Sequence, residues 1–486
     1  MQNVTPIYLC LFGLLFFTIV TAFAQSENEK PNIILIYVDD MGYNDLGCYG
    51  AIDPGIKTPN IDLLAAKGIR FTNYLSASNV CSPSRGAVLT GRYPQRNGLP
   101  VTPGPNDRPG FDLWNEHVGL PLSEITVAEL LKSQGYATAA FGKWHLGKMD
   151  GFGPRQQGFD EYIGRLHNFH IGRAGTWYHN EDPVDEIKFS QAHQKLTDAT
   201  IDFMERQQQN DKPFFIYLAH YLVHGPWSPN KEFCTPDEWA SYQEKKGKMN
   251  PKIFPAMVRE LDYHVGLVLQ KLEELNIGKE TMVILASDNG PWLPAGSAFP
   301  FSGGKYQTQE GGHRVPAIIR WPAGIPAEQV SDQLVSALDI LPTIAAATKT
   351  LLPTDRKYDG YNLLPMMSGK EKLSPRKEFA YYNGLTLEAV RQVDWKLHLP
   401  RDPDLTASCV YWAKRRNKKL AAPMLNNLQS DKAEKIALDD QKKINELEAM
   451  AEIYREELGD WNRNGTNRPK STYPGNLNTR EVVVEK

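Results

Sequence analysis

The chain has few cysteines, little net charge and no hydrophobic run long enough to span a membrane. Five cysteines among 486 residues are too few for a disulfide scaffold, which is a device of short secreted chains. A formal net charge of −3 argues against a nucleic-acid-binding protein, which usually presents a strongly basic face. The remaining composition, with 41% hydrophobic residues, is that of a globular protein and excludes disordered, collagen-like and coiled-coil chains.

The N-terminal apolar stretch Ile7–Val20 is shorter than the roughly 20 residues that a bilayer requires. It leads to Ala22-Phe23-Ala24, a small-residue cleavage pattern, and polar residues follow. We therefore predict a signal peptide over residues 1–24 and an exported protein, periplasmic or extracellular, with no stable membrane span after cleavage. No Lys or Arg precedes the apolar stretch, so a short membrane anchor stays open as the alternative.

Apolar runs at residues 31–38, 137–141, 214–218 and 282–286 are typical of strands buried on both faces of a parallel sheet. Helical patterns at 126–134 and about 255–275 lie between them. This alternation predicts an α/β fold with a large, mostly parallel central sheet flanked by helices, which we place in a first domain over residues 25–352.

The pattern changes in the last part of the chain. Short strand patterns at 378–382, 387–392 and 395–399 precede an amphipathic helix at 444–459. We predict a smaller C-terminal α+β domain over residues 353–486 that carries an antiparallel sheet.

Polar side chains follow each of the four predicted parallel strands. They are Asp39 and Asp40, Lys143 and His145, His220 and His224, and Asp288 and Asn289. Ligands of open α/β sheets bind at the carboxyl ends of the strands, so we predict one shared polar site at that edge. The acids and the asparagine offer oxygen donors, which suit Ca²⁺ or Mg²⁺. Taken singly, each pair would be explained by a turn or a cap.

A further segment, Cys81-Ser82-Pro83-Ser84-Arg85, leads into a helical pattern that begins near Ser84 and ends at Thr90-Gly91-Arg92. A helix N-terminus favours bound anions, so this segment is a candidate anion site. From the residues alone, Cys81 could equally be a small buried hydrophobic residue, the usual state of a free cysteine.

The C-x-P-x-R pattern followed by Thr-Gly-Arg resembles the signature of the formylglycine-dependent (type I) sulfatases, arylsulfatase-like members of the alkaline-phosphatase-like superfamily. Further segments match that family in order along residues 31–460. They are Ile36–Gly42, Gly142–Gly147, His224–Pro226, Ser287–Gly290, Gly303–Lys305 and Glu310–Pro316. One departure is that Val223, in place of the usual proline, precedes His224.

The resemblance implies a sulfatase whose Cys81 is oxidised to formylglycine by a sulfatase-maturating enzyme. In the family the hydrated aldehyde attacks sulfur and is regenerated when sulfate leaves. The resemblance also implies one Ca²⁺ ion. Its ligands would be Asp39, Asp40, Asp288, Asn289 and the residue at position 81.

The resemblance further implies roles for five catalytic side chains. Arg85 would steady the formylglycine diol and the metal ligands, and Arg85, Lys143 and Lys305 would stabilise the negative charge on the sulfuryl oxygens. His224 would protonate the leaving alcohol and His145 would act as the base, since histidine titrates near neutral pH. Which histidine performs which step stays open, and for His220 a structural hydrogen bond is the favoured interpretation.

The segment from Arg165 to Trp177 is dense in cationic and aromatic residues, which can bind sulfates and sugar faces. The candidate substrate-binding residues are Arg165, His167, His170, Arg173 and Trp177, although an ordinary loop is about equally consistent with this composition. Together with export, the segment favours a sulfated carbohydrate as substrate. A phosphoesterase or phosphonate hydrolase of the same superfamily stays open, as does a catalytically silent glycan-binding protein if Cys81 is unmodified.

Overall fold

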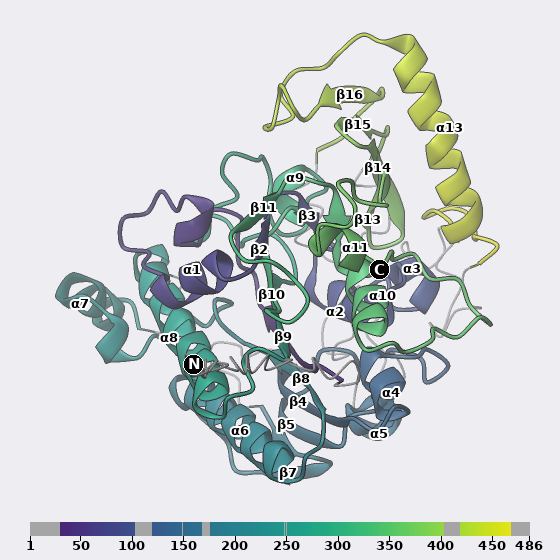
Figure 1. Ribbon diagram of the computed structural model, residues 1–486. Coiled ribbons are helices and arrows are strands. Elements are labelled where there is room, and N and C mark those ends of the chain that lie inside the picture. The colour runs from purple at the N-terminus through teal and green to yellow at the C-terminus, as the bar shows by residue number, and fades with distance from the viewer. Residues whose placement is uncertain are drawn as a thin grey trace, which may run out of the picture.

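The computed structural model describes residues 30–102, 119–147, 149–167, 175–246, 248, 250–402 and 418–467. Within these ranges ten strands form a central sheet in the order β11-β2-β10-β9-β1-β8-β4-β5-β6-β7 (Figure 1). The strands are β1 (Asn32–Val38), β2 (Ile69–Phe71), β4 (Ala137–Lys143), β5 (Glu161–Arg165), β6 (Trp177–His179), β7 (Asp182–Val184), β8 (Phe214–Ala219), β9 (Thr281–Ser287), β10 (Ala317–Arg320) and β11 (Gln329–Ser331).

The middle of the sheet is parallel. Strands β9, β1, β8, β4 and β5 pair in parallel, and β10 and β6 add antiparallel strands on either side. Ile36 of β1 is in register with Leu218 of β8 and Leu285 of β9. The large, mostly parallel sheet predicted from the apolar runs is therefore confirmed, and the carboxyl ends of these five strands lie at one edge.

Helices cover both faces of the sheet. Successive side chains of a strand point to opposite faces, and both sets are apolar here, so each face needs a covering layer. Ile33, Leu35 and Tyr37 of β1 pack into one core, and the residues between them pack into the other. Helices α2 (Cys81–Thr90), α4 (Val127–Lys132) and α10 (Ile340–Ala347) lie on the first face. Helices α1 (Pro59–Ala66), α6 (Phe189–Gln209) and α8 (Phe254–Glu274) lie on the second (Figure 1).

The predicted helices are present with small shifts at their ends. Thr126 and Glu129 form a reciprocal capping box that fixes the start of α4. Helix α8 has Pro255 in its first turn, where no intrahelical N–H bond is lost. The shorter elements are α3 (Pro94–Asn97), α5 (Met149–Phe152), α7 (Pro236–Glu244), α9 (Glu310–His313), α11 (Leu364–Met367), β3 (Tyr74–Leu75) and β12 (Val335–Ser336).

The C-terminal region forms a separate antiparallel sheet. Its order is β13 (Glu378–Asn383), β14 (Thr386–Gln392), β15 (Trp395–His398) and β16 (Met424–Asn427), with α13 (Gln441–Leu458) packed against β14 and β15. The antiparallel sheet and the helix were predicted, but β16 was not. Phe379 and Leu447 join the same core as β1 and α2, so the region packs directly on the catalytic layers. The boundary at residue 353 stays a prediction.

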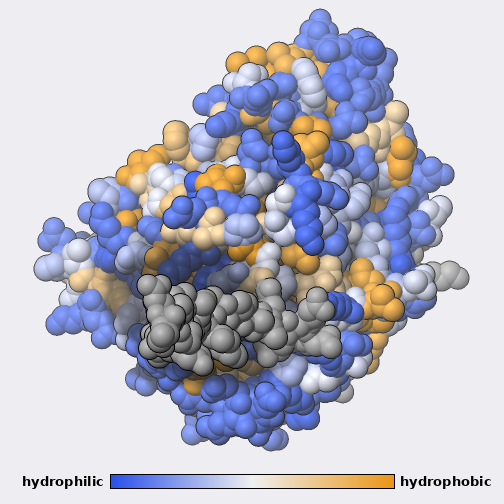
Figure 2. Space-filling view, viewed as in Figure 1, coloured by the Kyte–Doolittle hydropathy of each residue, from blue (hydrophilic) through white to orange (hydrophobic). Residues whose placement is uncertain are grey.

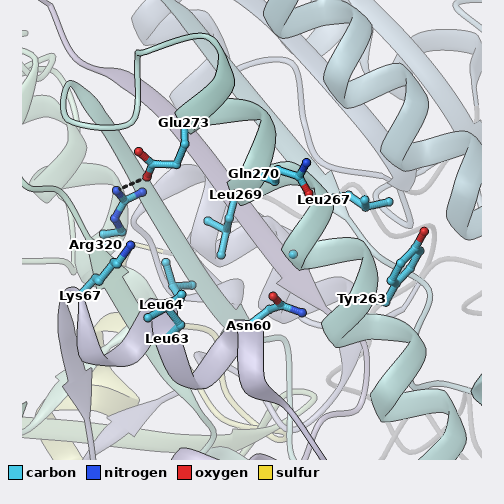
Figure 3. A pocket seen from close by; sticks show the side chains of 11 residues that line it. Asn60, Leu63, Leu64, Lys67, Tyr263, Leu267, Leu269, Gln270, Glu273 and Arg320 are labelled. Carbon is cyan, nitrogen blue, oxygen red and sulfur yellow. Dashed lines mark hydrogen bonds and ion pairs between the residues drawn. The ribbon is translucent and has the colours of Figure 1, made fainter.

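One face of the molecule is mostly polar. Hydrophilic residues cover most of the face in Figure 2, and hydrophobic residues occur in scattered patches. Over the described ranges, no helix combines the length and the apolar character that crossing a membrane requires. A groove of about 300 Å³ lies between α1 and α8 (Figure 3), where Arg320 pairs with Glu273 at 2.7 Å. Its lining residues are not among those that follow the parallel strands.

Candidate active site

The acids that follow β1 and β9 meet in one buried cluster. One ligand atom each from Asp39, Asp40, Cys81 and Asp288 lies within 4.8 Å of the others, and all four residues are buried. The Asp288 N–H donates to the carbonyl of Val38 at 3.0 Å, so the two strand ends stay paired as far as the acids. This confirms that the carboxyl ends of the parallel strands bring the predicted acids together.

Asp40 takes a left-handed backbone conformation, with φ of 62°, which few residues other than glycine adopt. That conformation lets its N–H donate to Asp288 Oδ1 at 3.1 Å. Asn289 Nδ2 in turn donates to Asp40 Oδ1 at 2.8 Å and to the Gly290 carbonyl.

The Asn289 side-chain oxygen is the acceptor of this cluster that is available to a ligand. Asn289 Oδ1 is buried and has no hydrogen-bond partner among the described residues, and buried acceptors rarely stay unpaired. Together with the carboxylates of Asp39, Asp40 and Asp288, it forms an all-oxygen donor set. This set fits a hard divalent cation, which prefers carboxylate and carbonyl ligands.

Cys81 is the first residue of α2, three residues before the helix start predicted from sequence. The helix includes Pro83 because a first-turn N–H has no intrahelical acceptor to lose. The Cys81 Sγ atom lies 3.4 Å from Asp39 Oδ1, 3.8 Å from Asp40 Oδ1 and 3.2 Å from Lys305 Nζ. It therefore faces the acid cluster directly.

The unmodified Cys81 thiol is poorly suited to nucleophilic attack. Burial raises its pKa, and the charges of Asp288 and Asp39 raise the pKa further against the opposing effect of Lys143 and Lys305. At neutral pH the group is a protonated thiol, and only a thiolate is an effective nucleophile.

Three buried cations balance the three buried acids. Arg85 donates through Nη2 and Nε to Asp288 Oδ2 at 2.7 and 3.0 Å. Lys143 Nζ lies 2.7 Å from Asp39 Oδ2, and Lys305 Nζ lies 2.6 Å from Asp40 Oδ1. The three ion pairs connect the ends of β1 and β9 to α2, to β4 and to the loop that carries Lys305. Together they fix the positions of the three acids.

The ionisation of the acids follows from these neighbours. Burial alone would raise the pKa of Asp39, but Lys143, His224 and Arg85 hold that pKa well below its usual range. Burial raises the pKa of Asp288 to about 6, and the negative charge of Asp39 contributes in spite of Arg85. Asp39 is therefore the firmly ionised member of the cluster.

The two candidate catalytic histidines have different surroundings. His224 is half-buried, with Nδ1 2.5 Å from the Gly225 carbonyl and Nε2 3.7 Å from Asp40 Oδ2. Burial lowers the pKa of His224, whereas the charges of Asp39 and Asp40 oppose this. His145 is more deeply buried. Burial lowers its pKa well below the usual value, and Lys143 lowers it further.

His220 lies away from the acid cluster. Its Nδ1 accepts a hydrogen bond from the Leu222 N–H at 3.2 Å, and its ring stacks on His193 with 5.1 Å between centroids. His264 lies beside both rings. The structural interpretation of His220 is therefore confirmed.

The candidate substrate-binding residues are only partly described. Arg165 ends β5 and Trp177 begins β6, and both are buried. The His167 ring lies 6.0 Å from the ring of His145, and His170 and Arg173 lie outside the described residues. Contact of any of these residues with substrate stays a prediction.

Two tyrosines of the site were not found from the sequence. The Tyr217 hydroxyl lies 3.4 Å from Arg85 Nη1, and the Arg85 guanidinium lies over the Tyr37 ring at 5.6 Å. Both belong to apolar strand runs, and their only sequence signal is a hydroxyl inside such a run. They hold Arg85 from β8 and β1.

Comparison with known proteins agrees with this geometry. The sulfatase family model matches residues 31–350, and a model of the C-terminal region of aryl-sulfatase matches residues 374–485. N-acetylgalactosamine-6-sulfatase of Canis lupus familiaris is 39% identical over 398 residues, which cover 77% of this chain and 73% of the relative. Human arylsulfatase A is 35% identical over 452 residues, which cover 84% of this chain and 83% of the relative.

A solved structure shares the whole architecture. The crystal structure of Ps i-CgsB in complex with k-i-k-neocarrahexaose superposes with a TM-score of 0.74 at 29% identity, over 88% of this chain and 93% of that one. The two matched family models span the acid cluster, the Cys81 helix and the C-terminal sheet. The chain belongs to the sulfatase family, whose members hydrolyse sulfate esters with formylglycine and a metal ion.

Proposed function

We propose that this chain is an exported carbohydrate sulfatase that acts through formylglycine at position 81 and one Ca²⁺ ion. The observation that carries the proposal is the position of Cys81 Sγ, at a helix N-terminus within 3.8 Å of two acids and one lysine. A nucleophile placed there faces both the candidate metal ligands and the cations that would receive a sulfate group.

The residues around position 81 support its conversion. Burial raises the pKa of the Cys81 thiol, which disfavours the reactive thiolate, and members of this family use formylglycine as the nucleophile at this position. In the family, formylglycine supplies an attacking hydroxyl and the metal ion supplies positive charge at the sulfate oxygens.

The charge balance of the site supports an anionic substrate. The three aspartates and the three cations compensate one another. A divalent ion held by Asp39, Asp40, Asp288 and Asn289 would make the site net positive, which favours a sulfate ester. Lys143 and Lys305 would then each donate to sulfuryl oxygens.

Arg85 has a different role in this proposal. Its guanidinium is fully buried against Asp288, Asp39 and two tyrosines. It therefore orients the acids rather than the substrate.

The surroundings of the two histidines support distinct roles. His224 is partly exposed beside Asp40. Burial lowers the pKa of His224, but the charges of Asp39 and Asp40 oppose this shift, so we assign His224 as the acid that protonates the leaving alcohol. His145 is held neutral by burial and by Lys143, so we assign it as the base that accepts a proton when sulfate is released.

The carbohydrate class rests on relatives and on the site edge. One relative is an N-acetylgalactosamine-6-sulfatase, and one similar structure is a complex with a neocarrahexaose. Arg165 ends β5 opposite Lys143, and the His167 ring lies 6.0 Å from the ring of His145. Side chains of this kind can bind carboxylates or further sulfates of a glycan. The predicted signal peptide supports export.

The first test is substrate class. Protein matured together with a formylglycine-generating enzyme should release sulfate from at least one member of a panel of sulfated mono- and oligosaccharides. The rate should exceed that on the corresponding sugar phosphate by at least about a hundredfold. The Cys81→Ala variant is the control and should release no sulfate. Turnover of simple aryl sulfates alone would contradict the carbohydrate proposal, and preferred phosphate hydrolysis would contradict the sulfatase proposal.

The second test separates the histidines by leaving group. His224→Gln should lower kcat on a sugar sulfate by about 10²–10³-fold, because a poor leaving alkoxide needs protonation. On an aryl sulfate with a good leaving group, the loss should stay within about tenfold. His145→Gln is the matched control and should lower kcat on both substrates alike. Equal losses on both substrates for His224→Gln would show that it is not the acid.

The third test concerns the metal ligands. Added Ca²⁺ should raise the Tm of chelator-treated protein, since an ion that binds only the folded state stabilises it. Asp288→Asn should reduce this rise, and its Ca²⁺ affinity in calorimetry should fall. Asp262→Asn removes a buried acid that bonds to Asn60 and Ile61 on the α1 side, and it should respond like the unchanged protein. An undiminished response of Asp288→Asn would remove Asp288 from the ligand set.

A further inference from the structure

Lys305 lies in a loop, residues 303–310, that we call the Lys305 loop. Its Glu310 end is attached to the C-terminal sheet. Lys305 Nζ contacts Asp40 and Cys81 at 2.6 and 3.2 Å. Five residues later, Glu310 begins α9, and its carboxylate is fully buried. Lys305 and Glu310 therefore belong to one short stretch of backbone, whose Lys305 end is also held by the Lys305 N–H donating to the Pro291 carbonyl at 2.9 Å.

Three side chains of the C-terminal sheet donate to the Glu310 carboxylate. Tyr381 Oη lies 2.6 Å and Lys396 Nζ 3.1 Å from Oε1, and Arg391 Nη1 lies 2.8 Å from Oε2. They come from β13, β15 and β14 respectively. Lys396 also lies over the Tyr381 ring at 3.8 Å, so the donors themselves are packed together.

The C-terminal region, including Glu434 beyond the sheet, also holds residues 308 and 310 of the loop. Lys396 Nζ donates to the Thr308 carbonyl at 2.8 Å, and the Thr308 hydroxyl donates to Glu388 Oε2 at 2.7 Å. The Glu310 N–H donates to Glu434 Oε2 at 2.6 Å. Residues 308 and 310 are thus bound through both side chain and main chain.

Such a network is an inefficient way to gain stability alone. Removing charges from water costs much of what their pairing returns, so buried ion networks often stabilise no better than apolar packing. They do fix geometry, because each partner accepts few orientations. A fixed geometry is what the loop needs, since Lys305 must meet both Asp40 and residue 81.

We propose that Glu310, held by Arg391 and Lys396, is a positioning residue that sets the Lys305 ammonium group against Asp40 and residue 81. The C-terminal sheet then contributes to catalysis without touching substrate. This inference rests on the catalytic role of Lys305 in the proposed function.

A double-mutant cycle tests the inference in the full-length, matured protein. Glu310→Gln keeps the side-chain shape and should lower kcat by about 10–100-fold, the size expected from misplacing a catalytic group. The KM should change by less than about threefold, as for an interaction used mainly in the transition state. Lys305→Ala should lower kcat further, and adding Glu310→Gln to it should change kcat by less than about twofold, because the two changes act through one group.

Asp339→Asn is the matched control for loss of a buried ion pair. Asp339 and Arg376 form such a pair, and neither contacts residues 303–310 in any described bond. At an equal loss of Tm, Asp339→Asn should keep kcat within about threefold of the unchanged protein. Arg391→Lys should retain more activity than Arg391→Met, since a lysine can still donate to Glu310.

The outcomes separate the two proposals. If Lys305→Ala keeps full activity, the catalytic role of Lys305 is wrong. Two results would show that Glu310 does not act through Lys305 although Lys305→Ala is impaired. In the first, Glu310→Gln keeps full kcat. In the second, it lowers kcat by the same factor in the unchanged protein and in Lys305→Ala. If Asp339→Asn lowers kcat as much as Glu310→Gln does, the loss of kcat in Glu310→Gln reflects general destabilisation and the positioning role is wrong.

Discussion

The structure depends on the pairing of three buried aspartates with three buried cations at one edge of the sheet. Asp39, Asp40 and Asp288 lie too close together to be buried unpaired, and Arg85, Lys143 and Lys305 each lie against one of them. Removing one partner of such a pair costs about 3–5 kcal/mol, because the other charge stays buried. Each of these buried charges therefore depends on its partner.

The sheet topology makes this pairing possible. Five parallel strands end at the same edge, so residues far apart in sequence meet there. Helix α2 places Cys81 over the acids from one face, and Lys305 reaches the same point from a loop. In the proposed positioning network, the C-terminal sheet completes the arrangement because it holds that loop through Glu310.

The features predicted from sequence are those carried by local patterns. The buried strands show as apolar runs, and Asp39 and Asp288 could be placed because they follow such runs directly. The start of α2 at Cys81 was missed by three residues, since a proline in the first turn gives no clear boundary. The partnership of Glu310 with Arg391 and Lys396 was not predictable, because it depends on the register of the C-terminal sheet, and β16 lacked a distinct pattern.

In the proposed function, Cys81 does not act as a thiol nucleophile. It is converted to an aldehyde, which then lies among these charged groups. The decisive measurement is mass spectrometry of the peptide that contains residue 81, from protein produced with a formylglycine-generating enzyme and active on a sulfate ester. We expect formylglycine at position 81, in a fraction that rises and falls with specific activity. Fully active protein in which residue 81 is entirely an unmodified cysteine would contradict this proposal.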